Sequence, residues 1–204
     1  MLNKSPAQPL LNRALLFERV HWEAPCAAET LATAIHKQLQ AIRAGCSELV
    51  LVCIGTDRST GDALGPIIGS QLIDTIPGLH VYGTLDEPVH AANLVEKIEL
   101  INSLHQGITI IAVDACLGRA ENVGYISAKS GPLYPGTGVK KTLPCIGDLH
   151  IIGTVNVGGF MEYLVLQNTR LSLVMNMARV ISTALSLATK THLGLLEASA
   201  TLQT

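Results

Sequence analysis

Two segments of the chain place aspartates directly after apolar runs, a pattern that suits acid–base chemistry. In residues 49–66 the apolar run leads into a glycine-rich turn that carries Asp57 and Asp62. In residues 108–118 a second apolar run ends at Asp114. Strand ends of an open α/β sheet converge at one edge, so these carboxyl groups can share a single crevice there. Such an acidic site is suited to holding a proton, a metal ion or a water nucleophile.

Each aspartate also has a purely structural interpretation. Asp62 stands at the start of a predicted helix, where aspartate is a common N-cap residue. Asp57 suits an Asx turn, and for either residue taken alone the structural role is the better explanation. Asp114 is different, because a carboxylate that follows an apolar strand must find a partner or face a cavity, since burial of a lone charge is costly.

A close pair of carboxyl groups offers a defined chemistry. Two carboxylates within a few ångströms cannot both ionise cheaply, so one pKa rises and the pair shares a proton. One member can then activate water while the other donates a proton to the substrate carbonyl or the leaving amine. Asp57, Asp62 and Asp114 are therefore candidates for such a pair, provided that the fold brings two of them together.

Further candidates follow the next predicted strand, residues 80–85. Asp86, Glu87 and His90 come after it and are expected at the same edge of the sheet, as groups that support substrate binding. The plainer interpretation is a loop whose polar residues meet water. A thiol nucleophile at Cys116, assisted by His90 or His150, is an alternative, although an isolated cysteine beside a strand is more often a small buried apolar residue.

Composition, charge and local motifs together disfavour several classes of function. The glycine-rich turn lacks the lysine of a phosphate-binding loop, which disfavours nucleotide binding. The net charge is −2, and the only adjacent lysines are Lys140 and Lys141, so no nucleic-acid footprint is present. No apolar run is long enough to span a bilayer and no signal peptide is evident, which predicts a cytoplasmic protein without a membrane contact. The five widely spaced cysteines indicate free thiols.

Alternating strands and helices carry these residues. The predicted elements are a helix at 31–42, strands at 49–54 and 80–85, helices at 63–75 and 93–105, strands at 108–113, 123–128 and 151–155, and a helical tail at 160–187 that is interrupted near Asn168. The order of the central elements predicts an α/β fold with a mostly parallel, doubly wound sheet. The glycine- and proline-rich stretch 131–147 is expected to be a functional loop.

The chain is expected to form one domain. We place an N-terminal, partly flexible arm at residues 1–26, a single α/β domain at residues 27–190 and a C-terminal tail at residues 191–204. The sequence also allows a homodimer formed through the helical tail.

Five separated blocks resemble a known family in the same order. The blocks are VCIGTDRSTGDALGP, GTLDEPVHAANL, IIAVDACLG, GPLYPGTGVKKTLP and GTVNVGGFMEYLVLQNTRL, which lie within residues 49–181. They resemble the YyaC sporulation protein family. More distantly, the chain is similar to the germination protease and to the hydrogenase maturation endopeptidases, and this resemblance implies a three-layer α/β/α sandwich.

The resemblance implies roles for individual positions. The germination protease has its proposed catalytic aspartates at the positions of Asp62 and Asp114. In the hydrogenase maturation endopeptidases the same positions help to bind nickel, together with a histidine before a late helix. Around that place this chain has Asn156, Gly158 and Gly159, which we take as supporting residues. Because Asn156 is a poor substitute for the histidine, no resident metal is predicted, with nickel or zinc as the open alternative.

Two functions follow from these observations. The first is a sporulation-associated peptidase with a protein or peptide substrate, in the cytoplasm or forespore of a spore-forming bacterium. The alternative is a non-catalytic sporulation factor that binds a peptide or protein partner in the same cleft. A third, weaker interpretation is metal-dependent recognition of a precursor protein.

Overall fold

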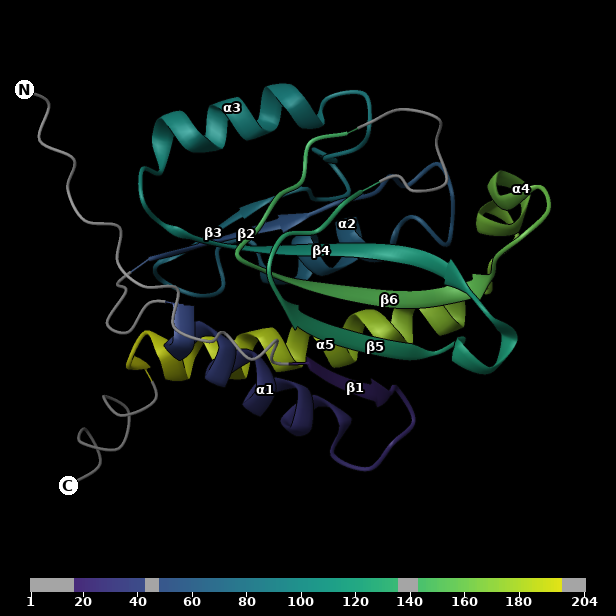
Figure 1. The fold of residues 1–204 in the computed structure, drawn as a ribbon, viewed down its shortest axis with the longest axis horizontal. Helices are drawn as coiled ribbons and strands as arrows, with labels where there is room; N and C mark the ends of the chain where they lie inside the picture. Colours follow the sequence, from purple (N-terminus) through teal and green to yellow (C-terminus); the bar gives the residue numbers. More distant parts are fainter. Residues whose placement is uncertain (1–16, 43–47, 136–142, 196–204) are drawn as a thin grey trace, which may run out of the picture.

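A central six-stranded sheet organises the protein. The computed structural model describes residues 17–42, 48–135 and 143–195 (Figure 1). The strand order is β1-β5-β6-β4-β2-β3. Strands β2, β3, β4 and β6 are mutually parallel, whereas β5 and β1 extend the sheet in antiparallel fashion. The strands are β1 (Phe17–His21), β2 (Leu49–Cys53), β3 (Leu79–Tyr82), β4 (Thr109–Gly118), β5 (Tyr125–Ser130) and β6 (Leu149–Val157).

Helices cover both faces of this sheet. The helices are α1 (Ala27–Ile42), α2 (Leu64–Leu72), α3 (Leu94–Leu104), α4 (Glu162–Gln167) and α5 (Leu171–His192), with a 3₁₀ turn at Ala120–Asn122. Buried residues of α1, α2 and α5 form one apolar cluster with the sheet, and α3 belongs to a second cluster. Figure 1 shows α3 on one side of the strands and α1 and α5 on the other. The predicted three-layer α/β/α fold is confirmed.

The pattern of the central strands explains these layers. All five residues of β2 are buried, as expected for a parallel strand covered on both faces. Leu49 and Leu51 join the cluster under α1, α2 and α5, whereas Val50 and Val52 join the cluster under α3. The period-two alternation of a strand therefore divides one continuous apolar run between two cores.

Two predicted element boundaries affect the candidate site, namely the break in the helical tail and the end of the strand before Asp114. The interruption of the helical tail near Asn168 is confirmed, because α4 and α5 are separate helices. The predicted end of the strand at Val113 is wrong, because β4 continues to Gly118. Pairing of β4 with β6 persists beyond Asp114, and this pairing keeps the chain extended after β2 has ended.

Segments near the two ends of the chain also contribute to the core. Residues 17–21, within the predicted N-terminal arm, form the edge strand β1. Helix α5 is long and apolar enough to cross a membrane, yet 44% of its apolar window is buried inside the protein. Its buried side chains, such as Met177 and Ile181, pack in the larger apolar cluster, so α5 serves here as a core helix.

The winding of the sheet reverses between β2 and β4. The chain leaves β2 through α2 to reach β3, then crosses the other face through α3 and returns to β4 on the far side of β2. The connections that leave the two neighbouring strands therefore diverge. In open α/β sheets a crevice forms outside the carboxyl ends of the strands at such a switch point, and ligands bind there.

Candidate active site

A cavity of about 410 Å³ occupies the crevice beyond β2 and β4. Both candidate aspartates, Asp62 and Asp114, line it. Its other polar or aromatic lining residues include Arg58, Ser59, His90 and Tyr163. The structure thus brings together three residues singled out in the sequence, which come from the turn after β2, from β4 and from the loop after β3.

A tight turn after β2 positions Asp62. Gly55 has a φ of +142°, and a Cβ atom there would lie 1.9 Å from the Asp62 carbonyl oxygen. The Thr56 amide donates to that carbonyl at 3.2 Å, which closes the loop. Farther along, the Gly61 amide donates to the Leu166 carbonyl at 2.9 Å and ties the loop to α4. Only glycine fits at position 55, because the backbone of the returning chain fills the space of a side chain.

Asp62 does not serve as a helix cap. Helix α2 begins at Leu64, its N-cap residue is Ala63, and no side chain caps it. The structural interpretation that competed with catalysis for Asp62 is therefore wrong. The half-buried carboxyl group instead lines the cavity.

Asp114 lies within β4 rather than after it. The last pair between β2 and β4 is Cys53 with Val113, whereas Asp114 still pairs with Ile152 of β6. Its side chain is therefore placed immediately beyond the end of β2, next to the open crevice. One carboxyl oxygen, Oδ1, accepts a hydrogen bond of 2.8 Å from the Ala115 amide.

The two carboxyl groups are electrostatically coupled. Burial raises the pKa of Asp114 well above its usual value, the nearby charge of Asp62 raises it further, and the Ala115 amide opposes the shift. Burial also raises the pKa of Asp62, whereas the Thr56 amide and, in its charged form, the His90 ring lower it. Asp114 is thus the member that holds a proton more strongly, and Asp62 is the member that ionises first.

The loop after β3 holds His90 rigidly at the cavity. The Asn93 side chain accepts a hydrogen bond from the His90 amide at 2.8 Å and donates to the Pro88 carbonyl at 3.0 Å. The Gly55 amide donates to the Val89 carbonyl at 2.8 Å, which joins this loop to the turn after β2. Asn93 occupies the N-cap position of α3, but its side chain makes no capping hydrogen bond and fixes the preceding loop instead.

Three acidic candidates lie outside the cavity. Asp57, Asp86 and Glu87 are exposed and do not line it. Asp57 Oδ1 accepts only a long hydrogen bond, 3.5 Å, from the Thr56 hydroxyl. The crevice expected to contain three aspartates therefore contains two.

The late glycine-rich block forms a neighbouring groove. Asn156 and Gly158 line a separate hollow of about 550 Å³ between the end of β6 and α4. The Asn156 amide nitrogen donates to the Val165 carbonyl and to the Thr169 hydroxyl, so this side chain fastens α4 to β6. Gly159 adopts a φ of +138°, and its amide donates to Glu162. Asn156, Gly158 and Gly159 are therefore not among the residues that line the carboxylate cavity.

Cys116 has a poor environment for a nucleophile. Burial raises the pKa of its thiol, which contacts the Thr154 hydroxyl at 3.5 Å. A thiol with a raised pKa contributes little thiolate at neutral pH. His150 lies at the start of β6, where its Nδ1 atom is hydrogen bonded to the Gly131 carbonyl. It therefore cannot assist Cys116 from that position. Regarding metals, no cluster of three or more His, Cys, Asp or Glu side chains suited to holding an ion occurs in the described ranges.

The sequence matches a family profile over most of its length. The profile named "Protein of unknown function (DUF1256)" covers residues 19–184. The chain belongs to the DUF1256 family.

A close relative of this DUF1256 protein tests the resemblance to the YyaC family. The "Uncharacterized protein YyaC" of Bacillus subtilis (strain 168) is 55% identical over 167 residues, which are 81% of this chain and 80% of the relative. Membership of the YyaC family is thereby confirmed. Among solved structures, the [NiFe] hydrogenase maturation protease HycI from Thermococcus kodakarensis KOD1 matches with a TM-score of 0.48 and 14% identity, over 74% of this chain and 98% of that one.

The carboxylate cavity of this DUF1256 protein also contains residues that were not predicted from the sequence. The Ser59 hydroxyl is buried and has no hydrogen-bond partner among the residues that the structure describes. Tyr163 and Leu166 reach the cavity from α4, far along the chain. A serine within the glycine-rich turn was a visible signal for Ser59, whereas no local pattern indicates that α4 folds back over this turn.

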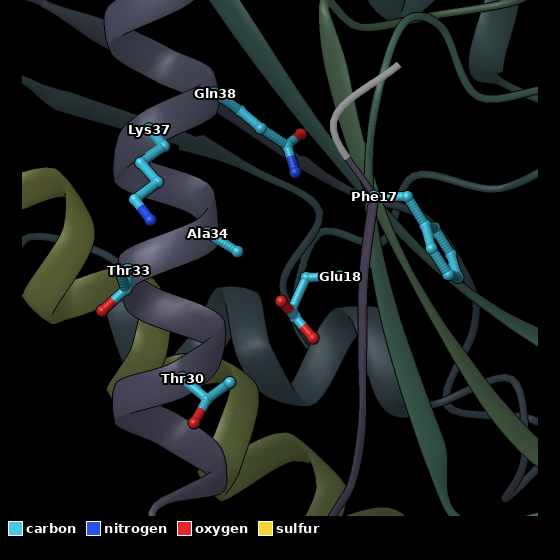
Figure 2. A pocket seen from close by; sticks show the side chains of 7 residues that line it. All are labelled: Phe17, Glu18, Thr30, Thr33, Ala34, Lys37 and Gln38. Atoms are coloured by element: carbon cyan, nitrogen blue, oxygen red, sulfur yellow. The ribbon is translucent and has the colours of Figure 1, made fainter. Parts of the chain in front are cut away.

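A further cavity of the DUF1256 protein, of about 400 Å³, lies between α1 and β1 (Figure 2). Glu18, Lys37 and Gln38 are among its lining residues. Gln38 is buried, and its amide group is bonded to the Ala128 carbonyl and the Ser130 hydroxyl at 3.4 Å each. This cavity lies at the edge of the sheet and contains neither candidate aspartate.

Proposed function

We propose that this DUF1256 protein is a peptidase that uses Asp62 and Asp114 as an acid–base pair. One observation carries the proposal: both carboxyl groups line one cavity at the switch point of the sheet, and the charge of Asp62 raises the pKa of Asp114. Such a pair retains one shared proton at a pH where isolated carboxylates have lost theirs. A site with one carboxylate and one carboxylic acid is equipped for the hydrolysis of an amide bond.

The environment of each group assigns the two roles. Asp62 is the base, because burial raises its pKa less than that of Asp114 and the Thr56 amide favours its ionised form. It takes a proton from water while the water oxygen bonds to the substrate carbonyl carbon. Asp114 is the acid, because burial and the neighbouring charge favour its protonated form. It gives its proton to the amide nitrogen as the carbon–nitrogen bond breaks, and the proton gained by Asp62 then restores the pair.

The surroundings favour a polypeptide as the substrate. Helix α4 projects beyond the ends of β4 and β6 (Figure 1) and flanks the cavity with Tyr163 and Leu166. On and beside it Phe160, Met161 and Tyr163 are 87%, 54% and 68% exposed. An exposed apolar patch beside a polar cavity is typical of a surface that binds extended chains. The sporulation context and a cytoplasmic or forespore location are supported by the resemblance to the YyaC sporulation proteins.

The direct test is cleavage of natural peptides. A library made by digestion of the soluble proteins of sporulating Bacillus subtilis is incubated with the protein, and new peptide ends are identified by mass spectrometry. The wild type is expected to generate new ends that are absent with Asp62→Asn and with Asp114→Asn. Asp57→Asn, an exposed residue on the same turn, is the matched control and should cleave as the wild type does. Absence of new ends with the wild type, or their persistence in both variants, contradicts the proposal.

The exposed surface of α4 also supports a second candidate, a non-catalytic partner-binding role. Binding requires the apolar residues but not the proton-sharing pair. Complementation of a deletion strain separates the two functions: a peptidase requires Asp114, whereas a binding factor tolerates Asp114→Asn and fails with Phe160→Ser. Because Phe160 is 87% exposed, its replacement is expected to leave the fold intact.

A further inference from the structure

The ring of His90 is held in one tautomer by its own loop. The Ala92 amide donates a hydrogen bond to His90 Nδ1 at 3.2 Å. A main-chain amide can only donate, so Nδ1 must be the acceptor. In the neutral ring the proton is therefore on Nε2, since the hydrogen bond at one ring nitrogen determines which nitrogen carries the proton.

The backbone around this ring is equally constrained. The Asn93 side chain bridges the His90 amide and the Pro88 carbonyl, and the Asn93 and Leu94 amides both donate to the His90 carbonyl. Five hydrogen bonds, counting that from Ala92 to the ring, thus hold residues 88–94. Such a pre-organised group can act on a substrate with little reorganisation.

The other ring nitrogen of His90, Nε2, is not hydrogen bonded to any residue that the structure describes. His90 lines the carboxylate cavity, and Nε2 has no hydrogen-bond partner among the described residues. The ion pairs found in the described part of the chain do not include one between His90 and Asp62. The ring and the Asp62 carboxyl group thus line the same cavity without forming an ion pair, so Nε2 is left to face the cavity.

We propose that His90 is a third catalytic residue, which donates a hydrogen bond from Nε2–H to the carbonyl oxygen of the scissile amide. This inference rests on the proposed peptidase function and assigns the one group of that site which the aspartate pair cannot supply. As the water oxygen bonds to the carbonyl carbon, the carbonyl oxygen gains negative charge, and Nε2–H stabilises it. The His90 proton stays on the ring throughout.

This division of labour resolves a conflict within the pair. The pair shares a single proton, and that proton must reach the amide nitrogen for the carbon–nitrogen bond to break. If the same proton also had to stabilise the oxygen, it could not serve the leaving group in the same step. A neutral imidazole that polarises a carbonyl solves this problem in other enzymes, and here the Ala92 amide enforces the required tautomer.

The first test is independent of any substrate. Nitrogen NMR of the protein labelled at histidine distinguishes a protonated from an unprotonated ring nitrogen. At pH 7.5 we expect the His90 ring to carry its proton on Nε2 and no proton on Nδ1. A His90 ring that carries its proton on Nδ1 overturns the inference.

The second test uses the peptide cleaved most rapidly in the library assay. His90→Phe is expected to lower kcat by about 10²-fold, the loss typical of removing one donor to a developing oxyanion, with KM changed less than about threefold. His90→Gln, which retains an N–H donor, should recover part of that loss, a recovery that a structural role would not produce. His36→Phe, a half-buried histidine of α1 away from the cavity, is the matched control.

The outcomes separate the two proposals. Loss of cleavage in Asp114→Asn together with wild-type kcat in His90→Phe overturns the role of His90 and leaves the peptidase intact. Absence of cleavage by the wild type overturns both. A reduced kcat in His90→Phe with partial recovery in His90→Gln supports the assignment.

Discussion

Two of the cavities of this protein, the one between α1 and β1 and the one that contains the carboxyl groups, are nearly equal in size but differ in the state of their polar groups. The cavity between α1 and β1 has a volume of about 400 Å³, and its buried polar side chain, Gln38, is hydrogen bonded at both ends. The carboxylate cavity has a volume of about 410 Å³ and contains the two coupled acids and the Ser59 hydroxyl, which has no hydrogen-bond partner among the described residues. Volume therefore does not distinguish these two cavities, whereas the state of their buried polar groups does.

Their walls differ as well. The α1–β1 cavity is bordered by side chains that project from a helix and an edge strand, such as Ala34, Gln38 and Glu18 (Figure 2). The carboxylate cavity is bordered by closely packed backbone, including the turn at Gly55. A site built on backbone keeps its geometry, which is what acid–base chemistry requires.

Adding carbon atoms to each wall tests this difference most strongly. Gly55→Ala places a Cβ atom against the Asp62 carbonyl oxygen and is expected to cost about 3 kcal/mol of unfolding free energy. Ala34→Leu extends a side chain into the α1–β1 cavity and should change stability by less than about 0.5 kcal/mol. Urea unfolding of both variants measures the contrast. Similar costs at the two positions would show that the walls are equally tolerant.

The pH dependence of stability tests the buried acid. Because the pKa of Asp114 is raised in the folded state, the folded protein retains a proton that the unfolded chain releases above its ordinary pKa near 3.8. The folded state binds more protons in that window, so stability falls as the pH rises through it. Asp114→Asn removes this penalty, and its stability relative to the wild type should increase from pH 4 towards pH 8.

A substitution in the other cavity serves as the control for this measurement. Thr30→Val carries no titratable group and should shift the curve of unfolding free energy against pH without changing its slope. If the Asp114→Asn and wild-type curves run parallel, Asp114 does not hold a raised pKa, and the acid role assigned to it fails.

Two buried serines provide a smaller, matched comparison. Ser59 has no hydrogen-bond partner within the described ranges, whereas the Ser182 hydroxyl donates to Gln71 at 2.7 Å. Ser59→Ala should therefore stabilise the protein by about 1 kcal/mol, because it removes an unsatisfied buried group. Ser182→Ala should destabilise it by a similar amount, about 1 kcal/mol. Thermal unfolding measures both, and destabilisation by Ser59→Ala would reveal a partner for that hydroxyl.

Much of this arrangement could be predicted from local sequence. Continuous apolar runs identified the central parallel strands, and their order placed Asp62 and Asp114 at one edge of the sheet. The end of β4 could not be predicted, because it depends on pairing with β6, whose strand begins more than thirty residues later. The residues Ala115 to Gly118 carry no local signal that opposes a strand or requires one.

The parts of the site that were not predicted depend on tertiary contacts. Asn93 has the sequence context of a helix cap, yet the loop before it has unsatisfied backbone groups that its side chain reaches first. The hydrogen bond from Gly61 to Leu166 brings α4 over the turn after β2. No periodicity in either segment specifies that contact. Local sequence thus located the acids, whereas packing determined which neighbours surround them.

Titration of the two carboxyl groups by carbon NMR tests the central claim most directly. With the aspartate carboxyl carbons labelled, we expect Asp62 and Asp114 to titrate in two separate steps. The upper step should lie well above the usual range for aspartate. Asp62→Asn removes the neighbouring charge and should lower the pKa of Asp114. Two ordinary aspartate titrations near pH 4, or an Asp114 pKa unchanged in Asp62→Asn, would contradict a shared proton in this cavity.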